Sequence, residues 1–201
     1  MKIIGIYGAS GAGKSTVSKL LLKYLPNSLL INGDYYMMEQ LQIQDEKIFK
    51  KLKIKKEKGV FSSNYIFQSF ENQNKTIKVI EKAVITSIKE QIEHEGNNKD
   101  YIIIDWLFLP LCKYFERCNI TICVTANYEK RLERLTNRLK NETIHKIGTK
   151  LYERYKEGII ENRVKFTALN EYGYKSNIEI ENNDNEIALE NKVKNILKEL
   201  Q

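Results

Sequence analysis

The residues with the clearest chemical pattern lie near the start of the chain, where positions 8–15 read GASGAGKS. This segment matches the phosphate-binding pattern GxxxxGK[ST], the Walker A motif, at every specified position. Glycines let backbone N–H groups turn inward and approach a phosphate closely, and Lys14 can bridge the β- and γ-phosphates of a nucleotide. The motif therefore predicts a P-loop that binds ATP with Mg²⁺ on the Ser15 hydroxyl. The expected contacts are Gly8, Gly11, Ala12, Gly13, Lys14, Ser15 and Thr16.

Two aspartates could hold the metal or activate a phosphate acceptor. Asp105 follows the apolar residues 102–104, and the end of such a strand is where a carboxylate that holds Mg²⁺, directly or through water, is expected. Asp34 lies at the C-terminal end of a second predicted strand, 28–31, and could take or orient the proton of an attacking hydroxyl. The alternative interpretations are a strand end or cap for Asp105 and an Asn-Gly-Asp turn for Asp34. The sequence leaves open which of the two lies nearer to the metal.

Two arginines are candidates for stabilising the charge that develops during phosphoryl transfer. Arg134 and Arg138 are one helical turn apart and precede a polar segment at 139–150 that we interpret as a lid. Both side chains could point toward the phosphates. The competing interpretation is a surface helix whose arginines pair with Glu129 and Glu133.

Alternating apolar runs and amphipathic segments predict the elements that position these residues. The expected strands are 2–7, 28–31, 101–105, 120–125 and 178–180. The expected helices follow residue 15, span 72–95, follow residue 125, extend to about 169, and end the chain around 189–200. Strands that alternate with helices predict a mainly parallel five-stranded sheet in a three-layer α/β fold of the P-loop NTPase type.

Length and composition indicate one soluble domain over residues 1–201. The chain has 201 residues with 42% hydrophobic content, enough for one sizeable core. Its mean hydropathy is -0.48, and no apolar run approaches the roughly 18–20 residues that span a bilayer. We therefore expect a cytoplasmic protein without a membrane partner. The three cysteines lack CxxC spacing, so we interpret them as reduced packing residues.

The net charge of +7 allows two interpretations, a nucleic-acid partner or a site for small polyanions on a lysine-rich surface. We expect a small-molecule phosphate acceptor and no nucleic-acid partner. Much of the excess lies at 47–58, where lysines alternate with apolar residues. We interpret this stretch as a solvated helix face, with a basic flap near a phosphorylated substrate as the alternative. The wider segment 40–75 is the expected acceptor-binding flap.

The order of these features resembles dephospho-CoA kinase, within the nucleoside-monophosphate-kinase-like group. The matching segments are the P-loop, Asp34, YIIID followed by LFL, ITICVT, RLERLTNR and NIEIENNDNEIALENKV, and residues 40–100 match poorly. The resemblance implies ATP phosphates on the P-loop, a catalytic acid at Asp34, lid arginines at Arg134 and Arg138, and adenine contacts near Asn182 and Asn183. The chain departs from that family at Trp106 and Leu107, where a proline is usual, and at residues 183–185, which lack a glycine.

A second resemblance concerns the acceptor. Residues 34–36 read DYY and are similar to the Asp-x-Phe/Tyr signature of uridine kinase-like enzymes. Both resemblances imply ATP-dependent phosphate transfer to a hydroxyl of a ribose-containing small molecule. A nucleotide-binding module without turnover remains an alternative, whereas a regulatory GTPase would need DxxG and NKxD strings that the sequence lacks. The acceptor's identity and the oligomeric state are left open.

Overall fold

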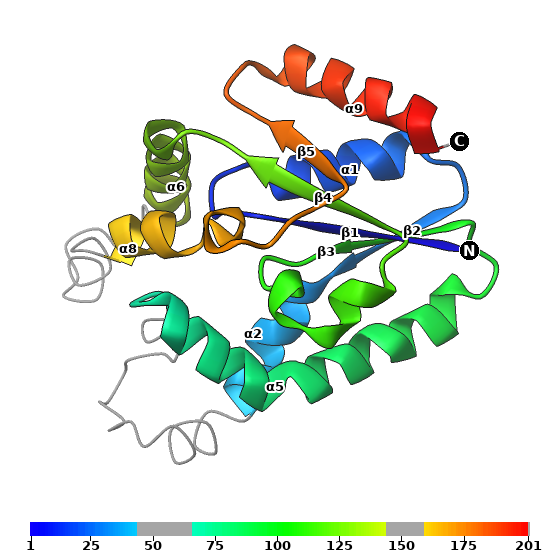
Figure 1. Ribbon diagram of the computed structural model, residues 1–201, viewed down its shortest axis with the longest axis horizontal. Helices are drawn as coiled ribbons and strands as arrows, with labels where there is room; N and C mark the ends of the chain where they lie inside the picture. The colour runs from blue at the N-terminus through cyan, green and yellow to red at the C-terminus, as the bar shows by residue number, and fades with distance from the viewer. Residues whose placement is uncertain (44–65, 144–158, 201) are drawn as a thin grey trace.

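The centre of the molecule is a five-stranded parallel sheet (Figure 1). The computed structural model describes residues 1–43, 66–143 and 159–200. The strands stand in the order β2 (Ser28–Asn32), β3 (Tyr101–Asp105), β1 (Lys2–Gly8), β4 (Ile120–Thr125) and β5 (Ile178–Glu181). The predicted strands and the predicted parallel α/β fold are confirmed.

Helices cover both faces of the sheet, so the molecule has three layers (Figure 1). On one face lie α1 (Lys14–Tyr24) and α9 (Glu186–Leu200). On the other lie α2 (Gly33–Ile43) and α5 (Phe70–Gln91). Each face of the sheet has its own hydrophobic core, one under α5 and one under α1. Side chains of β3 alternate between these cores: Ile102 and Ile104 pack on the α5 side, and Ile103 packs on the α1 side. A strand buried on both faces explains why 102–104 reads as a continuous apolar run.

Two further helices lie beyond the carboxyl end of the sheet. These are α6 (Tyr128–Thr143) and α8 (Ile159–Phe166), which share a small apolar core of Leu135, Ile160 and Val164. This cluster is separate from the two main hydrophobic cores of the molecule. The two helices that share it, α6 and α8, therefore pack on each other, and they lie at the edge of the sheet where parallel sheets bind ligands.

Several boundaries differ from the sequence prediction. The helix predicted at 72–95 is α5, capped by the Ser69 side chain and continued by the π-helix η1 (Ile92–Gly96). The connection after β3 forms two 3₁₀-helices, η2 (Leu109–Leu111) and η3 (Lys113–Arg117). A further 3₁₀-helix, η4 (Leu169–Tyr172), follows α8. The lysine-rich stretch at 47–58, residues 44–65 of the predicted flap and residues 144–150 of the predicted lid lie outside the described residues.

Other sequence-based expectations concern the membrane and the cysteines. None of the helices in the described part of the chain has the length and apolarity needed to cross a bilayer. Cys112 and Cys123 are buried in the α5-side core and Cys118 packs against it. Burial raises the pKa of all three thiols, to about 12 for Cys118 and Cys123, so they remain protonated at neutral pH.

Candidate active site

The P-loop, residues 8–15, connects β1 to α1 as a tight turn. Gly8 and Gly13 have φ values of 147° and 101°, a region that other residues rarely adopt. The Ala12 N–H donates to the Ala9 carbonyl at 3.0 Å, and the Val17 N–H donates to Gly13 at 3.1 Å, which starts α1. The predicted strand, glycine-rich loop and helix are therefore contiguous, and the loop ends at the positive end of a helix dipole.

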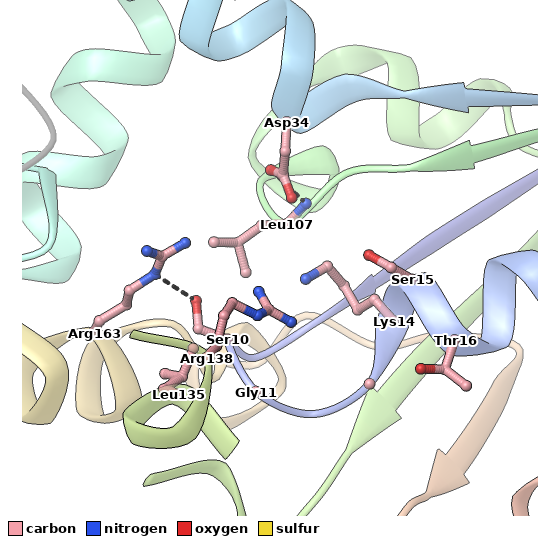
Figure 2. A pocket seen from close by; sticks show the side chains of 11 residues that line it. Ser10, Gly11, Lys14, Ser15, Thr16, Asp34, Leu107, Leu135, Arg138 and Arg163 are labelled. Carbon is pink, nitrogen blue, oxygen red and sulfur yellow. Dashed lines mark hydrogen bonds between the residues drawn. The ribbon is translucent and has the colours of Figure 1, made fainter. Parts of the chain in front are cut away.

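A cavity of about 90 Å³ opens over this loop (Figure 2). Five segments of the chain meet there: the P-loop with α1, α2, the turn after β3, α6 and α8. The lining residues are Ser10, Gly11, Gly13, Lys14, Ser15, Thr16, Asp34, Leu107, Leu135, Arg138 and Arg163. Of the expected P-loop contacts, Gly8 and Ala12 do not line the cavity.

Three cationic side chains and one carboxylate point toward the same space in Figure 2. Lys14 is 9% exposed, and within the described residues its ammonium makes no hydrogen bond or ion pair with a side chain. Arg138 enters from α6 and Arg163 from α8. A small cavity with this excess of positive charge suits an anion such as a polyphosphate.

Asp34 supplies the negative charge of the cavity. It lies in the first turn of α2, two residues beyond β2, rather than directly at the strand end that the sequence predicted. Its Oδ1 accepts a hydrogen bond from the Leu107 N–H at 3.3 Å. Burial raises the pKa of the Asp34 carboxyl, which Lys14 opposes and the nearby charge of Asp105 reinforces. A carboxyl with a raised pKa in a cavity is a candidate proton acceptor.

The close approach of α2 to β3 brings Asp34 to this position. A Cβ on Gly33 would lie 2.5 Å from the Cβ and Cγ atoms of Trp106, so only glycine fits where α2 begins. Trp106 is fully buried. The packing of this glycine on the indole places the next residue, Asp34, beside the Leu107 N–H.

Asp105 lies deeper than Asp34. It ends β3, is 4% exposed, does not line the cavity, and its Oδ1 is buried without a hydrogen-bond partner. A buried carboxylate oxygen without a hydrogen-bond partner is typical of a site where an ion or an ordered water binds. The described residues contain no cluster of three acidic, histidine or cysteine side chains. A metal here would therefore depend on Ser15, one carboxylate, and oxygens of phosphate and water, as Mg²⁺ does in nucleotide sites.

The two predicted lid arginines have different positions. Arg138 lines the cavity, whereas Arg134 does not. The guanidinium of Arg134 instead donates to the Gly11 carbonyl at 3.3 Å and to the Asn182 carbonyl at 3.0 Å. Arg134 thus connects α6 to the backbone of the P-loop and to the end of β5.

Of the two residues expected near adenine, Asn182 hydrogen-bonds to the P-loop and Asn183, within the described part of the chain, does not. Asn182 is 6% exposed, and its Nδ2 donates to the Ala12 carbonyl at 2.8 Å. Asn183 instead exchanges hydrogen bonds with Asn127, whose backbone N–H donates to the Asn183 Oδ1 at 2.7 Å. The two neighbouring asparagines therefore contact different segments.

Arg163 is the charged cavity residue that was not predicted from the sequence, and the cavity-lining Ser10, Leu107 and Leu135 were not predicted as site residues either. The Nε of Arg163 donates to the Ser10 hydroxyl at 3.1 Å, and its guanidinium lies 4.6 Å from the ring centroid of Phe67. The arginines predicted from the sequence, Arg134 and Arg138, both precede the predicted lid, whereas Arg163 follows it. The sequence did contain a signal, since the predicted helix that follows the lid also carries an arginine, Arg163. The packing of α8 on α6 brings this arginine to the cavity.

The sequence model of the family described as "AAA domain" matches residues 4–162. The chain belongs to this family. The matched region runs from β1 through the P-loop, Asp34, Asp105 and α6 into α8, so it includes most of the cavity of this AAA-domain protein.

Several solved structures share the fold of this AAA-domain protein, and some of them are kinases. TT1252 from Thermus thermophilus has a TM-score of 0.64 at 20% identity, with 100% of this chain and 98% of that chain covered. Shikimate kinase from Acinetobacter baumannii, in complex with shikimate, has a TM-score of 0.53 at 18% identity, covering 100% and 93%. Dephospho-CoA kinase from Campylobacter jejuni has a TM-score of 0.52 at 18% identity, covering 100% and 98%. No curated protein matches the sequence.

Proposed function

We propose that this AAA-domain protein is an ATP-dependent small-molecule kinase that transfers the γ-phosphate of ATP to a hydroxyl group. The observation that carries the proposal is the cavity in which Lys14, Arg138 and Arg163 face the carboxylate of Asp34 over a P-loop. Cations that gather around one carboxylate suit a reaction in which negative charge develops on phosphate while a proton leaves a hydroxyl.

The proposed reaction begins with ATP on the P-loop. Backbone N–H groups and the N-terminus of α1 bind the phosphates, and Lys14 lies between the loop and Asp34 to neutralise the terminal one. Arg138 and Arg163 add charge from α6 and α8. The acceptor oxygen forms a bond to the γ-phosphorus as the bond to the β-phosphate oxygen breaks, ADP leaves, and the hydroxyl proton passes to Asp34.

A Mg²⁺ ion would be held by the Ser15 hydroxyl and, through water, by the orphaned oxygen of Asp105. When bound, it would neutralise the β- and γ-phosphates. The side chains of Leu107 and Leu135 line the cavity beside these groups and would limit the access of water, which would otherwise take the phosphate.

For the acceptor we propose a ribose-containing molecule, with dephospho-CoA first. The order of motifs resembling dephospho-CoA kinase supports this choice, and so does the fold shared with the Campylobacter jejuni enzyme. A nucleoside such as uridine is the second candidate because of the DYY string at 34–36. Shikimate belongs in the test because two solved structures with this fold are shikimate kinases.

The test is ADP formation by the purified chain with Mg-ATP and each of dephospho-CoA, uridine and shikimate. We expect one acceptor to stimulate ADP release, and Lys14→Ala to lower the rate by about 10²–10³-fold. The control is Lys19→Ala, which removes an exposed lysine of the same helix. ATP binding without turnover for any acceptor would favour a nucleotide-binding module instead.

A further inference from the structure

The side chain of Asn182 fixes the direction of one peptide group in the P-loop. Its Nδ2 donates to the Ala12 carbonyl at 2.8 Å from the side of β5. In a trans peptide the carbonyl of one residue and the N–H of the next point in opposite directions. The Gly13 N–H is therefore directed away from Asn182, and Gly13 lines the cavity whereas Asn182 does not.

The contact depends on the absence of a side chain at Gly13. A Cβ at this position would lie 2.3 Å from the Nδ2 of Asn182, which is too close for any other residue. Asn182 itself is almost fully buried, so its amide is held against the loop rather than exposed to solvent. Glycine at position 13 and asparagine at 182 thus fit each other directly.

Arg134 strengthens the same arrangement. It donates to the Gly11 carbonyl at 3.3 Å and to the Asn182 carbonyl at 3.0 Å, so it holds the preceding peptide group and the backbone of Asn182 together. Two successive loop carbonyls, those of Gly11 and Ala12, therefore have donors outside the cavity. A loop held in this way is preorganised for an anion, since its N–H groups need not turn when the anion arrives.

We propose that Asn182 is a positioning residue, supported by Arg134, that orients the Gly13 N–H toward the phosphates of the nucleotide. This inference rests on the proposed function, since it requires the cavity to bind a polyphosphate. It differs from the adenine contact that the sequence resemblance implies for Asn182, because a positioning role acts on phosphate regardless of the base.

The discriminating probe is tripolyphosphate, which has the phosphate chain of ATP without the base. We would measure the dissociation constants of ATP and tripolyphosphate, both with Mg²⁺, by calorimetry on the wild type and on Asn182→Ala. In Asn182→Ala the Gly13 N–H is no longer oriented, so its hydrogen bond to the charged phosphate is lost or weakened. We therefore expect the dissociation constants of both ligands to rise by a similar factor, about tenfold or more. Weakened ATP binding with unchanged tripolyphosphate binding, or no change for either, would overturn the inference.

A matched control is Asn177→Ala. It removes an asparagine just before β5 that bonds Thr121 and makes no hydrogen bond to the P-loop among the described residues, so both dissociation constants should stay at the wild-type value. Asn182→Ser serves if the alanine variant does not fold, because its hydroxyl is one bond shorter and does not span to the Ala12 carbonyl. A wild-type chain that binds neither ligand would overturn the proposed function itself.

A local readout separates positioning from a general loss of stability. When an N–H donates to phosphate, its proton resonance moves downfield. We expect the Gly13 amide to show this shift on addition of tripolyphosphate in the wild type and in Asn177→Ala, and to lose it in Asn182→Ala at saturating ligand. An unchanged Gly13 shift in Asn182→Ala would contradict the proposed role.

Discussion

The Nε–H of Arg163 donates a hydrogen bond to the Ser10 hydroxyl at 3.1 Å, which joins α8 directly to the P-loop. The backbone N–H of the same serine donates to the Thr167 hydroxyl at 2.9 Å, immediately after α8 ends. Two bonds to one loop residue fix the helix relative to the loop. The cation of Arg163 is thus placed by the loop that would bind the nucleotide.

We expect Arg163→Lys to lower kcat/KM by about 10–100-fold with any acceptor that the wild type uses. Lysine keeps the charge but has neither the Nε–H for Ser10 nor the planar group that lies on the Phe67 ring. Steady-state kinetics would measure the change, with Lys165→Ala, an exposed lysine of the same helix, as the control. Wild-type kinetics in Arg163→Lys would show that charge alone suffices at this position.

The two arginines of α6 should give opposite results. Arg138 is exposed and lines the cavity, so Arg138→Ala should lower kcat by about 10²-fold or more and leave the melting temperature unchanged. Arg134→Ala removes two charge-assisted hydrogen bonds to backbone carbonyls, so it should lower the melting temperature by about 2–4 °C for each kcal/mol lost. Paired kinetic and thermal unfolding measurements test this, and a stable Arg134→Ala with only lowered kcat would contradict it.

Asp34→Asn should abolish most activity and yet stabilise the fold at neutral pH. Burial raises the pKa of the Asp34 carboxyl in the folded chain, so the folded state holds the proton more tightly than the unfolded state. Such a carboxyl destabilises the fold once the pH exceeds its unfolded pKa of about 4, and contributes nothing below that. The variant should therefore melt higher than the wild type near pH 7 and at the same temperature near pH 3.

Thermal unfolding across this pH range checks the sign. Asp184→Asn is a suitable comparison, because its exposed carboxylate pairs with Lys192 at 2.8 Å and its pKa is lowered. That substitution should not raise the melting temperature at neutral pH. A lower melting temperature for Asp34→Asn near pH 7 would mean that the attraction of Lys14 outweighs the cost of burial.

Gly33→Ala should destabilise the protein and reduce activity together. The added Cβ would meet Trp106 at 2.5 Å, so α2 or the indole has to move, at a cost of about 1–3 kcal/mol. The movement also displaces Asp34. Gly173→Ala is a control in which no atom lies within 4 Å of the added Cβ, although its φ of 87° costs some backbone strain. Equal activity for Gly33→Ala and the wild type would show that Asp34 does not need this packing.

The sheet and the loop could be predicted from the sequence because their signals are local. Residues 102–104 form a continuous apolar run since β3 is buried on both faces, and GASGAGKS requires no distant partner to be recognised. Asp34 was also found, although its place in the first turn of α2 depends on Gly33 packing on Trp106.

The division of roles among the arginines could not be predicted in the same way. Arg134 and Arg138 are one turn apart on one helix, and helical spacing alone gives both the same face. Which of them reaches the cavity depends on where α6 sits against Gly11 and Asn182, a contact between segments far apart in the chain. Arg163 was missed for a related reason, since only the packing of α8 on α6 brings it to the P-loop.

The packing of Trp106 on Gly33 also gives the protein a built-in optical reporter. Trp106 is its single tryptophan; it directly follows Asp105, and its buried side chain packs on Gly33 at the start of the helix that carries Asp34. Tryptophan fluorescence therefore arises from one location, next to two residues that line the cavity, Asp34 and Leu107. Titrations of nucleotide and acceptor could be followed from its emission in the unlabelled native chain, without attaching a dye.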